Sequence, residues 1–257
     1  MAPTKMTNQE QSLRVDTAAG FRWLQRWEMH DLAAGSLVTR LPENKDWMFS
    51  HTQGVYFHEI CASDLFKVGF DLEALDGSMH RTNHAAINPA KWIFEARPDV
   101  NAVVHVHPHA VVAVSALKCG ILPITPPSFF FQSGVAWVDA EFHFGDEYCK
   151  QMVEALGDGK ILMIRNHAFT AVGRTVAEAM YLAYSFTETC KLQMQILQTG
   201  QEIHIPTDEE LADHALSYTD DNCRLQEDGT RGQEYDGSME WPGLLRILDR
   251  EEPDYRN

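Results

Sequence analysis

Three histidines have the residue type and the spacing to bind one metal ion. His105 and His107 stand at alternate positions of a β-branched run. In a strand their side chains point to the same face, about 7 Å apart along the backbone. A third histidine, His167, follows a second apolar run. Three imidazoles that leave a coordination position open are typical of a catalytic zinc site, and the alternative is a set of ordinary strand histidines.

The segments around these histidines predict the elements that position them. Residues 100–106 are β-branched and almost continuously apolar, which indicates a strand covered on both faces that delivers His105 and His107 at its end. Residues 161–173 predict an apolar strand that bends at the Asn-His pair containing His167. The two strands would therefore bring the three imidazoles together.

The rest of the chain alternates between strand and helix patterns. The longest helix is predicted over residues 175–199, where apolar residues recur at helical spacing and Thr175 precedes Glu178 by three residues, as in a capping box. Residues 47–54 and 55–60 are expected to pair as a hairpin or as adjacent antiparallel strands. Further helices are predicted at 9–31, 89–97, 111–117, 147–156 and 243–250, and further strands at 36–40, 62–70 and 135–145.

Composition limits the class of protein. The 257 residues, 44% of them hydrophobic, suffice for one domain with a sizeable core. The formal net charge of −16 argues against nucleic acid as a partner, because binding phosphates needs clustered Lys and Arg. Neither a signal peptide nor a membrane-spanning run is evident, so we expect a cytoplasmic protein. The five cysteines form no CxxC pair, which argues against a disulfide scaffold.

Two sequence blocks resemble the class II aldolase/adducin family. They are RPDVNAVVHVHPHA, which contains His105 and His107, and ILMIRNHAFTAVGRTVAEAMYLAYSFTETCKLQMQ, which contains His167. The end of the chain, SMEWPGLLRILDR, is similar to the adducin-type branch, so the resemblance covers most of residues 31–250. It implies that the three histidines bind a divalent metal, with zinc expected and Fe(II) or Mn as alternatives.

The resemblance also implies the architecture. We expect an α/β fold with a central, mainly antiparallel sheet flanked by helices on both faces. Residues 1–257 would form a single domain, with residues 1–12 flexible and residues 201–257 an acidic extension that packs on the domain or on a neighbouring subunit. Members of the family are typically homotetramers, so a homo-oligomer is expected, with a small molecule as substrate.

The sequence departs from the aldolases of this family at the acid/base residue. These aldolases carry a catalytic glutamate about twenty residues before the paired histidines, and ungapped alignment places Ala86 there. Their phosphate-binding loop is replaced by AGSLVT, which makes a phosphorylated substrate doubtful. We predict His84, the nearest ionisable side chain, as a proton carrier or fourth ligand. Tyr235 is a second candidate, as a proton donor from a neighbouring subunit.

Three functions remain open. The first is a metal-dependent lyase that stabilises an enolate-type intermediate during aldol cleavage or decarboxylation. The second is a non-haem Fe(II) oxygenase on the same fold, acting on an aromatic or apolar oxo or hydroxy acid. The third is a non-catalytic, adducin-like interaction module. The aromatic run 129–131 within the expected loop 121–134 is interpreted as core or subunit contact, or else as an apolar substrate pocket.

Overall fold

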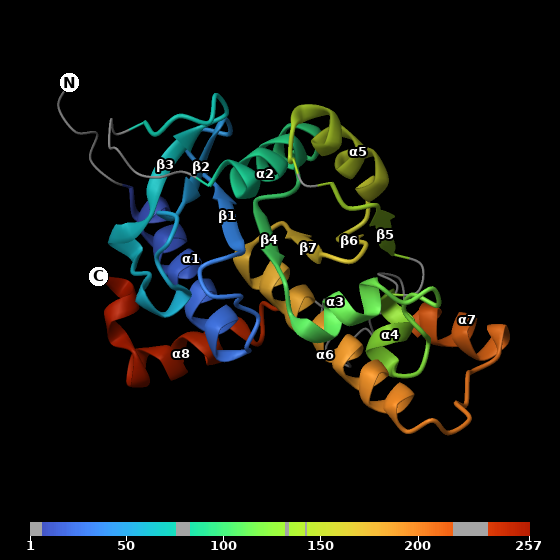
Figure 1. Cartoon of the computed structure of the whole chain (residues 1–257). Helices are drawn as coiled ribbons and strands as arrows, with labels where there is room; N and C mark the ends of the chain where they lie inside the picture. Colours follow the sequence, from blue (N-terminus) through green and yellow to red (C-terminus); the bar gives the residue numbers. More distant parts are fainter. Residues whose placement is uncertain (1–6, 76–82, 132–133, 142, 218–235) are drawn as a thin grey trace.

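A single mixed sheet organises the chain. The computed structural model describes residues 7–75, 83–131, 134–141, 143–217 and 236–257. In this part of the chain seven strands follow the order β3-β2-β1-β4-β7-β6-β5 (Figure 1). The strands are β1 (Ser36–Arg40), β2 (Trp47–Ser50), β3 (Phe66–Gly69), β4 (Ala102–Val106), β5 (Val135–Val138), β6 (Ile161–Ile164) and β7 (Ala168–Gly173). All neighbours are antiparallel except β5 and β6, which confirms the predicted α/β class.

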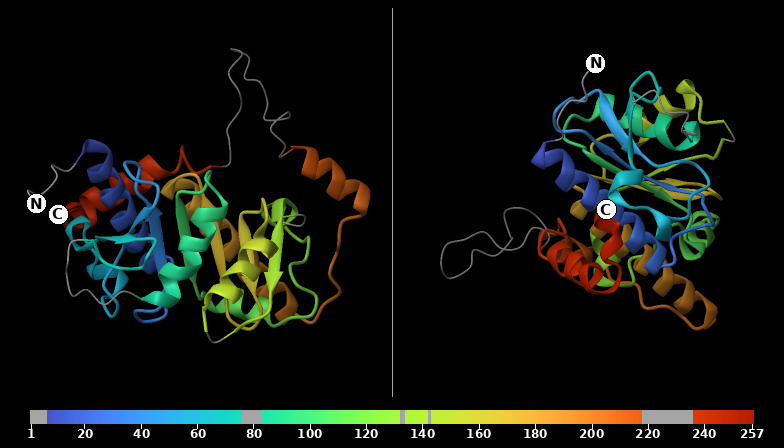
Figure 2. Two further views of the ribbon diagram at one scale, coloured as in Figure 1. Left: turned by 90° about the horizontal axis from the view of Figure 1, so that it is seen from above. Right: turned by 90° about the vertical axis from the view of Figure 1, so that its left-hand side faces the viewer.

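Helices cover both faces of this sheet, as predicted. They are α1 (Asn8–Arg26), α2 (His84–Ala96), α3 (His109–Ser115), α4 (Pro126–Phe131), α5 (Asp146–Leu156), α6 (Val176–Gln198), α7 (Asp208–Ser217) and α8 (Trp241–Glu251). Helices α2 and α5 lie on one face, whereas α1, α3 and α6 lie on the other (Figures 1 and 2). Helix α1 begins at Asn8, inside the stretch for which flexibility was expected.

Side chains that alternate along the strands pack into two hydrophobic cores, one on each face of the sheet. In β4, Ala102, Val104 and Val106 face the core formed with α1 and α6. Val103 faces the opposite core, formed with α2 and α5. Because successive strand residues point to opposite faces, His105 shares the face of Val103. Burial on both faces explains why residues 100–106 form an almost unbroken apolar run.

Several predicted elements match the structure closely. Strand β1 has the predicted bounds, and α6 begins directly after Thr175, whose hydroxyl accepts a hydrogen bond from the Glu178 backbone N–H. This bond is one of the two hydrogen bonds that make up a capping box. The Glu178 carboxylate instead accepts from the Arg174 backbone N–H at 2.6 Å.

Two predictions around the first half of the sheet are wrong. Residues 55–60 do not form a strand, since residues Phe57–Glu59 form a 3₁₀ turn, and β2 pairs with β3 instead. The Phe57 ring packs 5.0 Å from that of Phe21 on α1, so its hydrophobic side chain serves the core without a strand. Helix α2 begins at His84 and contains Pro89, which the prediction had placed at its start.

Three further predictions need correction. Residues 161–173 form two antiparallel strands, β6 and β7, where one bent strand was predicted. The expected loop at 121–134 contains α4, whose first two residues are prolines, a residue type that fits the first turn of a helix because it lacks an N–H. Phe131 in α4 is buried and packs on Phe186, which supports the core interpretation of the aromatic run. The acidic region after residue 201 contains the helix α7.

Within the described ranges, no helix is both long enough and apolar enough to cross a membrane.

Candidate metal centre

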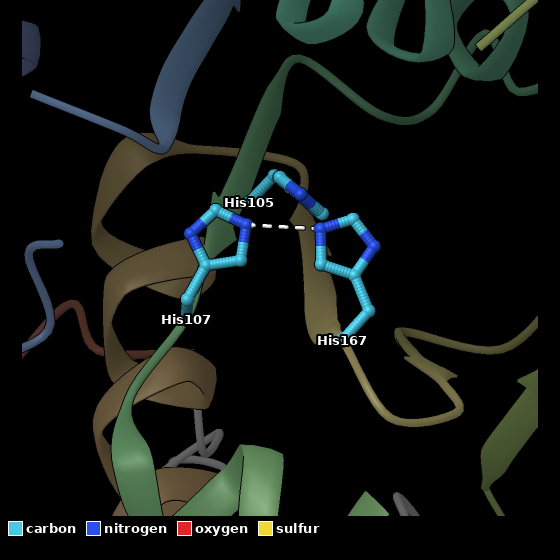
Figure 3. A group of neighbouring side chains, drawn as sticks. All are labelled: His105, His107 and His167. Carbon is cyan, nitrogen blue, oxygen red and sulfur yellow. Dashed lines mark hydrogen bonds between the residues drawn. The ribbon is translucent and has the colours of Figure 1, made fainter. Parts of the chain in front are cut away.

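The three predicted histidines meet on the α2/α5 face at the middle of the sheet. One ring nitrogen from each of His105, His107 and His167 can be chosen so that all three lie within 4.8 Å of one another. The Nε2 atoms of His107 and His167 are 3.2 Å apart, and the His105 ring lies behind the other two (Figure 3). All three side chains are half-buried. Residues 60 positions apart are thus brought into one site, as the sequence predicted.

His105 is positioned by the register of the sheet. Strand β4 pairs with β7 so that His105 lies opposite Thr170. The His105 Nδ1 atom is 3.1 Å from the Thr170 hydroxyl oxygen, so Nε2 is the nitrogen left to bind a metal. Metal-binding histidines are commonly held in this way by a second hydrogen bond, which fixes the orientation and tautomer of the ring.

His107 follows directly on β4, beyond the end of the strand. Gly35, in front of β1, has φ +101°, and a Cβ there would lie 3.0 Å from the His105 carbonyl oxygen. The backbone of β1 therefore approaches the histidine strand more closely than a larger residue would allow. The Nδ1 atom of His107 is buried and has no hydrogen-bond partner in the described part of the chain.

His167 lies in the tight turn that joins β6 to β7. Its backbone N–H donates to the Ile164 carbonyl at 3.2 Å. Asn166 at the centre of this turn has φ 55°, a left-handed conformation that asparagine tolerates better than most residues. The turn directs the His167 ring toward His107 (Figure 3).

The surroundings keep the imidazoles neutral. Burial, followed by the neighbouring His107 and His167, lowers the pKa of His105 well below its usual value. Burial and His167 lower the pKa of His107 to about 4, which the Asp31 carboxylate partly opposes. Burial also lowers the pKa of His167. Metal binding requires the unprotonated imidazole, so all three groups are in the binding form at neutral pH.

The donor set fits a divalent metal. Three neutral nitrogen donors suit zinc, and tetrahedral Zn–N bonds of about 2.0–2.1 Å separate neighbouring nitrogens by roughly 3.3 Å. The observed 3.2 Å between the Nε2 atoms of His107 and His167 agrees with that spacing. Three protein ligands also leave a position for water or substrate, as in catalytic zinc sites.

One aromatic ring borders the centre and one carboxylate acts on it electrostatically, and the sequence had indicated neither. The ring centroid of Phe144 lies 6.1 Å from that of His105 and 5.9 Å from that of His167. Asp31 is exposed and lies in a short turn closed by a bridge to Ala34. No local pattern marks either residue, because each is brought near the histidines only by the folding of a separate loop.

The remaining candidates either do not belong to the three-histidine group or lie outside the described residues. His84 is the exposed first residue of α2 and does not belong to the three-histidine group. Ala86 is buried in the same helix, so no carboxylate occupies the position of the family's glutamate. Tyr235 lies outside the described residues. Exposed His109 begins α3 and is likewise not part of the group.

Comparisons with known proteins agree with this fold. The profile of the Class II Aldolase and Adducin N-terminal domain matches residues 15–194, a range that includes all three histidines. A protein of Caulobacter vibrioides, provisionally named an aldolase class 2 protein, is 32% identical over 252 residues, which are 98% of this chain and 94% of that protein.

An adducin and a solved structure extend the comparison. Human gamma-adducin is 29% identical over 247 residues, which cover 93% of this chain but only 35% of the adducin. The crystal structure of an aldolase II superfamily protein from Pseudomonas syringae has a TM-score of 0.87, with 28% identity and 98% coverage of both chains. The chain belongs to the class II aldolase and adducin family.

Proposed function

We propose that the protein is a divalent-metal-dependent lyase that cleaves a C–C bond next to a carbonyl or carboxylate group of a small substrate. The observation that carries this proposal is the approach of the three imidazole nitrogens of His105, His107 and His167 to within 4.8 Å. A divalent metal, with zinc preferred, would supply a Lewis acid for a substrate oxygen at this position. Family membership supports the reaction class, since the family takes its name from aldolases.

The residues of the chain would orient the reacting groups and control water. Thr170 would hold the His105 ring, and the Phe144 ring would cover one side of the centre. We further propose His84 as the proton carrier, because Ala86 offers no acid or base. Tyr235 would be a second proton donor. Assembly as a homotetramer is part of the same proposal, and light scattering of the purified protein measures it.

A non-catalytic interaction module is the second candidate, and the similarity to human gamma-adducin favours it. The intact three-histidine set argues against this reading, because a protein that only binds partners has no need of three converging neutral imidazoles. The metal content of the protein distinguishes the two candidates.

The first experiment is elemental analysis of anaerobically purified protein, combined with product analysis on 2-oxo and hydroxy acids. One equivalent of zinc or manganese with cleavage products and no oxygen uptake supports the lyase. Iron together with substrate-dependent oxygen uptake would contradict the lyase and indicate an Fe(II) oxygenase acting on an oxo or hydroxy acid. Absence of stoichiometric metal would contradict the lyase and indicate the non-catalytic interaction module.

A further inference from the structure

We propose that the protein binds a small organic cation, one with an alkylated ammonium group, in a pocket between the end of α1 and the helices α6 and α8. The pocket encloses about 420 Å³, a volume within the range of small-molecule sites. It is called the aromatic pocket below, after its residues Trp27, Tyr181, Tyr184 and Trp241. The proposal is independent of the lyase activity.

Four aromatic side chains from three helical segments line the pocket. Trp27 directly follows α1, Tyr181 and Tyr184 belong to α6, and Trp241 begins α8. The ring centroids of Trp27 and Tyr184 are 4.8 Å apart and the ring planes are inclined by 47°, so the two rings form adjoining walls rather than a stack. The faces of aromatic rings attract cations, and cages of such rings recognise alkylated ammonium ions.

The charge of the pocket lining is negative. Glu240, the residue before α8, lines the pocket, and among the described residues no lysine, arginine or histidine does so. The chain as a whole is acidic too, with 37 acidic and 21 basic residues, and such a field attracts cations. A cation would therefore meet aromatic rings and a carboxylate without a competing positive charge, whereas an anion would be repelled.

The helix ends around the pocket do not reverse this charge. Trp27 lies at the C-terminal end of α1, where the helix dipole favours a cation. The starts of α6 and α8 also border the pocket, but an acidic residue offsets the positive end of each helix. Glu178 lies in the first turn of α6, and Glu240 directly precedes α8.

Two walls of the pocket are fixed by contacts within the fold. The indole N–H of Trp241 donates to the Asp16 carboxylate at 2.9 Å, which holds the ring in place. Gly237 has φ +73°, and a Cβ at this position would clash with the Ala177 carbonyl oxygen, so the segment before α8 lies directly against α6. Walls that are in place before the ligand arrives reduce the ordering needed for binding.

The pocket has a buried aromatic floor and an accessible aromatic rim. Tyr181 and Tyr184 are three residues apart on α6, so their side chains lie on the same side of the helix. Tyr184 has an exposed fraction of 40%, whereas Trp241 has one of 7%. A small ion can therefore enter from the solvent and lose part of its hydration against the rings, where the attraction between cation and ring is stronger.

The aromatic pocket is separate from the candidate metal centre. Helices α1 and α6, which border the pocket, lie on one face of the sheet, and α2 and α5 lie on the other (Figures 1 and 2). The three histidines meet on the α2/α5 face. A cation bound in the aromatic pocket therefore does not contact them.

The test is calorimetric titration of choline into the full-length protein. The second probe is the neutral analogue of choline in which carbon replaces the ammonium nitrogen, because it has the same shape without the charge. The test variants are Tyr184→Leu, which removes an aromatic wall at an exposed position, and Glu240→Gln, which removes the negative charge. The matched control is Tyr56→Leu, which removes a tyrosine of similar exposure, 41%, that does not line the pocket.

The wild type is expected to bind choline about fivefold more tightly than the neutral analogue, because only the cation is attracted by the ring faces and by Glu240. Tyr184→Leu and Glu240→Gln should each weaken choline binding about fivefold and leave the neutral analogue nearly unaffected. Tyr56→Leu should bind both probes like the wild type. Absence of choline binding in the wild type, equal affinity for the two probes, or unchanged choline affinity in Tyr184→Leu overturns the proposal.

A second copy of the chain is the competing occupant of the aromatic pocket, and light scattering of the same proteins identifies it. A wild type that does not bind choline and forms an oligomer that Tyr184→Leu dissociates would show that another subunit covers the pocket. That result also overturns the proposal. Choline binding with the same oligomeric state in both proteins supports it.

Discussion

Thr170 lies directly across the sheet from His105, with its hydroxyl oxygen 3.1 Å from the imidazole Nδ1. The contact joins the two central strands β4 and β7 at the first of the three histidines of the candidate metal centre. Thr170 is buried, so water cannot replace it as a partner of the ring. The tautomer of His105, and with it the nitrogen that faces the centre, depends on this one hydroxyl.

Removing this hydroxyl should weaken metal binding without unfolding the protein. In Thr170→Val the imidazole loses its orienting partner, and zinc affinity should fall about 10–100-fold. Thr170→Ser keeps the hydroxyl and should bind zinc nearly as the wild type does. Competition with a chromophoric chelator measures both affinities, and circular dichroism controls for folding. Equal losses in the two variants would show that the hydroxyl does not position the ring.

The histidines should divide into ligands and a proton carrier. His107→Ala should lose bound metal and activity together, because its Nε2 is one of the converging donors. His84→Ala should keep one equivalent of metal and lose turnover about 10²–10⁴-fold, if the residue transfers a proton. His109→Ala is the matched control, since it also removes an exposed histidine that begins a helix. Stoichiometric metal in His107→Ala would refute the ligand assignment, and unchanged turnover in His84→Ala would refute the proton carrier.

His51 should make the fold sensitive to mild acid. The ring is buried against Phe21 and Phe57, its Nδ1 has no hydrogen-bond partner among the described residues, and burial lowers its pKa to about 4. The unfolded chain takes up this proton near pH 6.5, so stability is lost as the pH falls below 6.5 and the loss ends below about 4.

Between pH 7 and pH 5 this group alone should lower the free energy of unfolding by about 2 kcal/mol. Urea unfolding at both pH values measures the effect. The comparison is His51→Leu, which has no titrating group and should lose correspondingly less stability over the same range. Parallel pH profiles for the two proteins would assign the acid sensitivity to other groups.

The C-terminal segment should depend on one buried arginine of α1. Arg22 has an exposed side-chain fraction of only 5% and pairs with Glu252 at 3.1 Å and Asp254 at 2.8 Å. Arg22→Met leaves these carboxylates without their partner and should cost about 2 kcal/mol of stability, measured by urea unfolding. Arg26→Met, which removes a more exposed cation facing the same segment, should cost less than about 1 kcal/mol. Equal losses of unfolding free energy in the two variants would mean that the burial of Arg22 adds nothing to the stability contributed by its ion pairs.

Local sequence patterns were sufficient to predict several elements. The Thr175 cap and the helical spacing that follows it predicted α6, and the β-branched run predicted β4 with His105 at its end. Local patterns failed where side chains serve a distant partner. Phe57 lies in a segment whose residues are typical of a strand, but its ring packs against Phe21 of α1. The loop expected at residues 121–134 contains α4, which is held in place by packing of Phe131 on Phe186.

For the candidate metal centre, the sequence indicated the donor side chains but not their environment. Histidines at alternate strand positions and in the Asn-His turn, together with the family resemblance, named the three candidate ligands. Three features follow from the folded chain alone: Thr170 holds His105, Phe144 borders the centre, and burial lowers the pKa of His107 to about 4. Each of these depends on residues far apart in the chain, because strand register and burial arise only when separate elements pack together.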